Sequence, residues 1–82
     1  MKKIDHYGDK NIIYNRLRSA REASKLSQAK LAAQMQLLNV NLDQQMISRI
    51  ERNERIVTDY EIVCFARVLG VSTDWLLGDY KY

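Results

Sequence analysis

One stretch in the middle of the chain places hydrogen-bonding side chains along one side of a predicted helix. The helix is expected from Gln44 to about Arg52, with Asp43 as its N-cap. At about 100° per residue, one arc of about 140° holds its polar side chains, which are Gln44, Gln45, Ser48, Arg49 and Arg52. Glutamine can pair with N6 and N7 of adenine, and arginine with O6 and N7 of guanine. This face is suited to reading the edges of DNA bases. An ordinary solvated helix face is the alternative.

The opposite arc of the same helix is apolar and predicts packing against a core. It contains Met46, Ile47 and Ile50. Glu51 lies at the edge of this arc, where an unpaired carboxylate would be costly. Arg21 adjoins the apolar stripe of an earlier predicted helix. We therefore expect a structural salt bridge between Arg21 and Glu51, and a solvated charge at the helix end is the alternative.

Four more helices are predicted around this one from apolar spacing and from residues that start or stop helices. A first helix is expected from about Asn11 and a second over residues 27–38. A fourth follows the capping-box pair Thr58 and Glu61, and a fifth follows Ser72. These elements predict an all-α protein folded as a compact five-helix bundle.

Length and composition indicate one small domain without catalytic machinery. The chain has 82 residues, and we expect a tail or arm over residues 1–10, the domain over residues 11–78 and a tail over residues 79–82. Cys64 and His6 are too isolated for a metal site or a catalytic pair, and no glycine-rich phosphate loop is present. We therefore expect no enzyme activity, no catalytic residue, no metal, no cofactor and no small-molecule site.

Charge and cysteine usage suggest where the protein acts and what it binds. Residues 1–55 carry 11 Lys and Arg against 6 Asp and Glu, whereas residues 56–82 carry 2 against 4. The positive part contains the polar helix face, as expected for binding to nucleic acid phosphates. The single cysteine cannot form an internal disulfide, and no apolar run is long enough to span a membrane. The sequence predicts a cytoplasmic protein that is not bound to membranes.

Five short motifs, in this order along the chain, resemble the Cro/C1-type helix-turn-helix regulators of the Xre family. They are Leu26-Ser27-Gln28, Leu31-Ala32, Ile47-Ser48-Arg49-Ile50-Glu51, Leu69-Gly70-Val71-Ser72 and Asp74-Trp75-Leu76-Leu77. The resemblance implies a lambda-repressor-like DNA-binding domain. Its second and third helices would form the helix-turn-helix, and the third would enter the major groove.

The resemblance also implies a role for each polar residue near these helices. The residues expected to read bases are Gln44, Gln45, Ser48 and Arg49, although Arg49 could equally hold a phosphate. The residues expected to contact phosphates or to support the interface are Gln28, Arg52, Asn53 and Arg55. A simple helix-start residue is the alternative for Gln28, and an exposed charge in the connector is the alternative for Arg55. Lys2, Lys3 and Lys10 form either a basic arm or a disordered tail. Trp75 is expected in the core, with a dimer interface as the alternative.

The connection between the second and third helices departs from the family pattern. Family members usually have Gly soon after the residue that matches Met35, followed by a short turn. This chain is several residues longer there, which predicts an extended second helix and a wider turn over residues 36–41. Asn39 tolerates the left-handed conformation that ends many helices. The relative placement of the two helices is left open by this insertion.

The sequence thus favours a sequence-specific regulator of transcription that binds a double-stranded DNA operator. A repressor acting as a homodimer, at least on DNA, fits the resemblance best, because such dimers bind half-sites roughly 34 Å apart. The alternative is a protein-interaction module of the same fold, such as an antitoxin or a subunit that binds another regulator.

Overall fold

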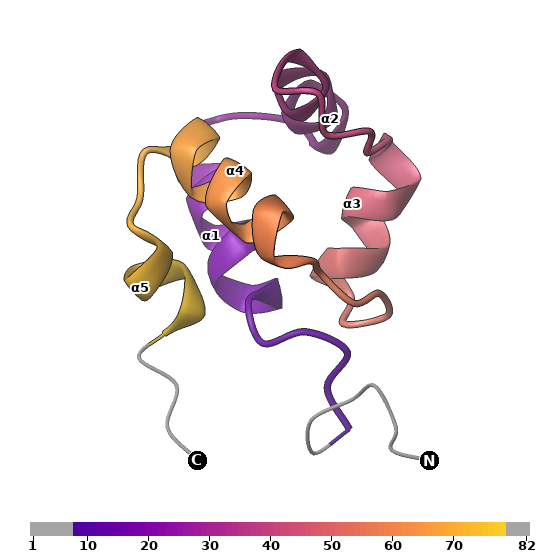
Figure 1. The fold of residues 1–82 in the computed structure, drawn as a ribbon, viewed down its shortest axis with the longest axis vertical. Coiled ribbons are helices and arrows are strands. Elements are labelled where there is room, and N and C mark those ends of the chain that lie inside the picture. The colour runs from indigo at the N-terminus through magenta and orange to yellow at the C-terminus, as the bar shows by residue number, and fades with distance from the viewer. Residues whose placement is uncertain (1–7, 79–82) are drawn as a thin grey trace.

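The computed structural model describes residues 8–78 and contains the five predicted helices (Figure 1). They are α1 (Tyr14–Ala23), α2 (Gln28–Leu37), α3 (Gln44–Glu51), α4 (Asp59–Leu69) and α5 (Thr73–Leu77). In Figure 1, α4 crosses in front of α1, α2 and α3 lie next to each other, and α5 lies beside α1. The predicted all-α fold class is confirmed. Lys2 and Lys3 of the predicted arm, and the predicted tail over residues 79–82, lie outside the described residues.

Four helices begin at polar N-caps that the local sequence identifies. In each case the cap side chain accepts a hydrogen bond from the backbone N–H three residues later, and the caps are Ser27, Asp43, Thr58 and Ser72. Thr58 and Glu61 form both bonds of the predicted capping box. These caps fix where α2 to α5 begin.

The first helix starts later than predicted, at Tyr14 and not near Asn11. The side chain of Asn11 is buried and donates from Nδ2 to the carbonyl oxygens of Ile50 (3.1 Å) and Arg55 (2.9 Å). Its Oδ1 accepts a hydrogen bond from the backbone N–H of Ile13. Asn11 therefore anchors the N-terminal segment to the end of α3 and to the connection that follows it.

The core lies where α1 to α5 meet, and every helix contributes to it. The side chains with no exposed surface are Leu17, Leu31, Met35, Ile47, Ile50, Phe65 and Leu76. Trp75, which was expected in the core, is instead 39% exposed, and its neighbour Leu76 fills the core position. The guanidinium of Arg16 lies over the Trp75 ring, 5.1 Å from its centroid.

The long connection between α2 and α3 has a defined conformation. α2 ends at Leu37, and Asn39 has a φ of 62°, so the left-handed helix end predicted there is present. Val40 and Leu42 are both buried in the core. The Gln36 side chain donates from Nε2 to the carbonyl oxygen of Leu42 at 2.9 Å. The extra residues therefore anchor the turn and fix the position at which α3 begins.

Candidate nucleic-acid interface

α3 buries one side and exposes the polar side that the sequence predicted for base reading. Ile47 and Ile50 have no exposed surface. Gln44, Gln45 and Arg49 are exposed and Ser48 is half-buried. None of the side-chain hydrogen bonds or ion pairs described within residues 8–78 uses these four polar side chains. Their donors and acceptors are therefore available to a ligand.

The buried side of α3 is attached to α1 and α2 through Glu51. Arg21 donates to both carboxylate oxygens, from Nε to Oε2 at 2.6 Å and from Nη2 to Oε1 at 3.0 Å. Nη1 of Arg21 donates to the carbonyl oxygen of Leu26, and Nε2 of Gln28 donates to Oε1 of Glu51 at 3.0 Å. The two charged side chains are only 12% and 4% exposed. This bidentate geometry rigidly links three helices.

The electrostatics of Arg21 follow from this arrangement. The hydrogen bond to Glu51 raises the pKa of Arg21, and it outweighs the lowering effect of burial. The negative charges of Glu51 and Glu22 raise the pKa further. The guanidinium therefore stays charged, and the buried carboxylate of Glu51 keeps its partner.

The side chain of Asn53 holds the N-terminal segment against the end of α3. Its Oδ1 accepts from the backbone N–H groups of Lys10 (2.8 Å) and Asn11 (3.3 Å), and its Nδ2 donates to Asp9 at 2.7 Å. Asn53 also ends α3 with a φ of 61°, in the left-handed region. Asn53 therefore anchors Asp9 and Lys10 to the end of α3.

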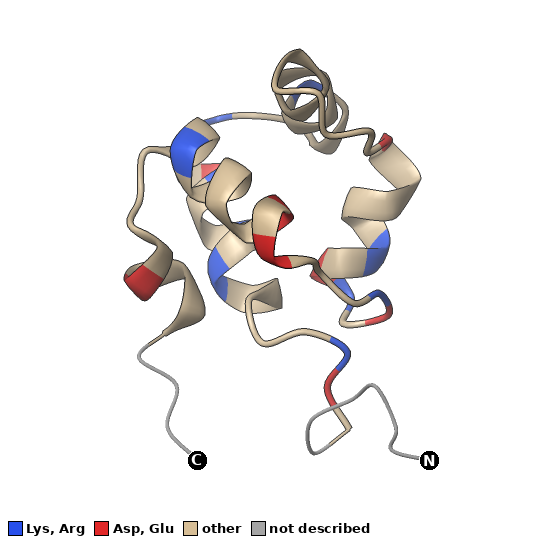
Figure 2. Ribbon diagram, viewed as in Figure 1, with Lys and Arg blue, Asp and Glu red and all other residues tan. Residues whose placement is uncertain are grey.

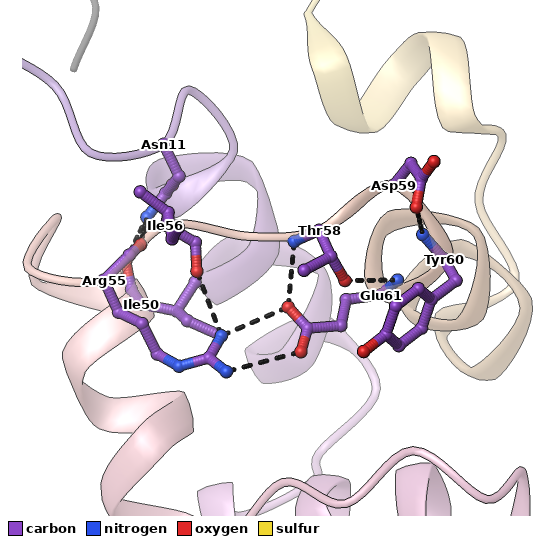
Figure 3. Close-up of polar contacts among 8 residues, drawn as sticks. All are labelled: Asn11, Ile50, Arg55, Ile56, Thr58, Asp59, Tyr60 and Glu61. Carbon is purple, nitrogen blue, oxygen red and sulfur yellow. Dashed lines mark hydrogen bonds and ion pairs between the residues drawn. The ribbon is translucent and has the colours of Figure 1, made fainter. Parts of the chain in front are cut away.

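A second ion pair stabilises the segment between α3 and α4 (Figure 3). Arg55 donates to both oxygens of Glu61, at 3.1 and 3.4 Å, and also to the carbonyl oxygen of Ile56. Glu61 also accepts from the backbone N–H of Thr58 at 3.0 Å, and its side chain is 4% exposed. The sequence indicated only the capping-box role of Glu61. The Arg55 pair was missed, because a contact across a loop leaves no periodic signal.

Arg52 lies next to this segment and is more loosely held. Its guanidinium lies 3.4 Å from a carboxylate oxygen of Glu54, and both side chains are more than half exposed. Exposed pairs of this kind contribute little to stability, so Arg52 can exchange Glu54 for another anion at small cost. Figure 2 shows basic residues in α3 and in the following loop, and acidic residues at the start of α4 and in α5.

Comparisons with known proteins agree with this geometry. A family model described as helix-turn-helix matches residues 17–76, which is most of the chain. The chain belongs to the helix-turn-helix family. Within it, the Cro/C1-type resemblance is confirmed, so the protein is classed with DNA-binding regulators and not with enzymes.

A solved structure gives the same result for the fold of this helix-turn-helix protein. The chain is similar to the P22 c2 repressor, whose crystal structure was determined in complex with synthetic operator 9T in the presence of Tl⁺. The two chains are 26% identical with a TM-score of 0.70, and the match covers 84% of this chain and 97% of the repressor chain. No curated protein sequence matches the chain significantly.

Residues 8–78 show no sign of a membrane-spanning helix or of a metal site. No helix in this part of the chain is long and apolar enough to cross a membrane. In the same part, no group of three or more His, Cys, Asp or Glu side chains is placed to hold a metal ion.

Proposed function

We propose that this protein is a sequence-specific transcriptional repressor that binds double-stranded DNA in the cytoplasm as a homodimer. The observation that carries the proposal is that Gln44, Gln45, Ser48 and Arg49 on the polar face of α3 form no side-chain bond within residues 8–78, while the opposite face is fixed in the core. A rigid helix with free amide and guanidinium groups can be held in a major groove without first breaking internal bonds. The similarity to an operator-bound repressor supports the same reading.

Within this proposal the base-reading residues are those of the first two turns of α3. Gln44 and Gln45 come first after the N-cap, where residues of a recognition helix contact base edges. Ser48 and Arg49 lie one turn further along. Arg49 is long enough to reach either a guanine or a phosphate. We propose it as a base-reading residue, with a phosphate contact as the alternative.

The phosphate contacts and their supports are proposed in two groups. Arg52 contacts phosphate directly, because its guanidinium is exposed and only weakly paired. Asn53 and Arg55 act as supports, since their side chains are bonded to Asp9 and Glu61 and hold the segment after α3 in place. Gln28 also supports α3 through its bond to Glu51, and its Oε1 accepts no hydrogen bond from the part of the chain that the structure describes.

The experiment that tests this proposal is selection of bound sites from random DNA, followed by binding with a Gln44→Ala/Gln45→Ala variant. We expect enrichment of one symmetric site, and loss of preference for that site in the variant with its fold intact by circular dichroism. An Arg18→Ala variant is the control, because Arg18 lies on the exposed face of α1. If no site is enriched from random DNA and the double variant keeps partner binding and the cellular phenotype unchanged, the protein-interaction module is the better account.

A further inference from the structure

An exposed apolar stripe follows the outer face of α4 and the residue that leads into it. Ile56 is 43% exposed, Tyr60 58% and Val63 56%. Tyr60 and Val63 lie within about 60° of each other around the α4 axis, and Ile56 lies in the connection before Thr58, the N-cap of α4. In Figure 1, α4 crosses in front of α1, and no described segment lies in front of it. None of these three residues is among those assigned to the DNA interface above.

Two opposite charges flank this stripe at equal distances from its centre. Asp59 is four residues before Val63, and Arg67 is four residues after it. Both are exposed and lie within about 40° of Val63 around the helix axis. Neither forms an ion pair within the part of the chain that the structure describes. The α4 surface is thus acidic at its beginning, apolar in the middle and basic at its end.

This order of charges is complementary to itself when the helix is reversed. We propose that a second copy of this chain packs on the α4 stripe, with the two α4 helices antiparallel across a two-fold axis at Val63. Asp59 then faces the partner's Arg67, and Arg67 faces the partner's Asp59. Each Val63 meets the partner's Val63, and Tyr60 adds aromatic contact area at the edge. A two-fold contact between identical surfaces requires this kind of pairing, and Tyr and Arg are enriched in interfaces.

A second apolar surface, within residues 8–78, lacks this self-complementarity. A hollow of about 320 Å³ lies between α1, α5 and the connection from α4, and its lining includes Ala20, Ala23, Leu69, Val71 and Trp75. Within residues 8–78 no acidic side chain lines this hollow. A contact there is the competing outcome of the test.

The first test measures self-association of the full chain without DNA, by analytical ultracentrifugation from micromolar to millimolar concentration. Asp59→Arg and Arg67→Asp should each weaken the dimer about tenfold, because each replaces two attractive pairs by two repulsive ones. The combined variant D59R/R67D should restore the wild-type dissociation constant. It should do so although both changes oppose the α4 helix dipole and lower the thermal stability. Arg18→Asp, with the same change of charge as Arg67→Asp, should leave the dimer unchanged.

The second test is cross-linking, which does not depend on charge. In a Cys64→Ala background, Val63→Cys should form a covalent dimer under oxidised glutathione, because the two thiols meet at the axis. Ser19→Cys, beside the Trp75 hollow, should cross-link slowly.

Any one of three results would overturn this assignment. They are faster cross-linking of Ser19→Cys than of Val63→Cys, a combined variant that dimerises no more tightly than the single variants, and a monomer at all concentrations. Neither measurement contains DNA, so their failure would leave the proposed DNA recognition standing. Loss of specific DNA binding would likewise leave the α4 contact standing.

Discussion

Replacing Arg21 by alanine should destabilise this fold far more than replacing the other paired arginine of the same helix. Arg21→Ala leaves the carboxylate of Glu51, which is 4% exposed, with only the amide of Gln28 as a side-chain partner. Breaking a buried pair on one side costs about 3–5 kcal/mol. Because Gln28 remains, we expect the lower end of this range, about 3 kcal/mol in the free energy of unfolding.

The matched control is Arg18→Ala, one turn earlier on α1. Arg18 forms a pair with Glu22 in which the side chains are 62% and 57% exposed. Losing an exposed pair at this spacing should cost only about 0.3–0.5 kcal/mol. Urea unfolding followed by far-ultraviolet circular dichroism measures both variants. For a domain of this size the Arg21 variant should also melt roughly 12–24 °C lower.

A third variant separates the charge of the pair from its volume. Arg21→Met/Glu51→Leu removes both charges and keeps apolar volume, so its stability should return to near that of the wild type. Because the pKa of Arg21 is raised, the contribution of its positive charge to stability is present at all pH values below the alkaline range. This contribution is lost only in strong alkali. A cost for Arg21→Ala no larger than that for Arg18→Ala would refute the structural role of this pair.

Four further substitutions test the interface and the turn that positions it. Gln44→Ala and Gln45→Ala should each weaken binding to the selected operator by about 1–3 kcal/mol and leave binding to random DNA unchanged, as measured by fluorescence anisotropy. Arg52→Ala should weaken binding to both DNAs alike and reduce the slope of log affinity against log salt by about one; an effect on the operator alone would contradict a phosphate contact. Leu42→Ala should lower the free energy of unfolding by about 2–5 kcal/mol because Leu42 is 1% exposed, and a cost below about 1 kcal/mol would show that the turn is not anchored in the core.

The features that the sequence predicted correctly depend on short-range chemistry. Ser27, Asp43, Thr58 and Ser72 each bond a backbone N–H three residues away, so the caps of α2 to α5 can be read from local sequence. The inward and outward faces of α3 follow from helical periodicity. Arg21 and Glu51 were matched across 30 residues because a carboxylate on an apolar edge needs a partner beside the same core.

The features that were missed depend on contacts between distant segments. Asn11 and Asn53 bond across 39 to 44 residues, and nothing in their neighbourhoods indicates those partners. Asn11 therefore looked like the start of a helix, and Asn53 like a residue that contacts phosphate or supports the interface. α5 has only five residues, too few for periodicity to decide whether Trp75 or Leu76 faces the core.

The most direct test of the central claim is the ratio of affinities for the selected operator and for a scrambled duplex of equal length, measured at several salt concentrations. The account predicts a ratio of about 10³ or more near physiological salt. It also predicts that the Gln44→Ala/Gln45→Ala variant loses most of this preference. Equal affinity for the two duplexes at every salt concentration would contradict sequence-specific recognition by α3.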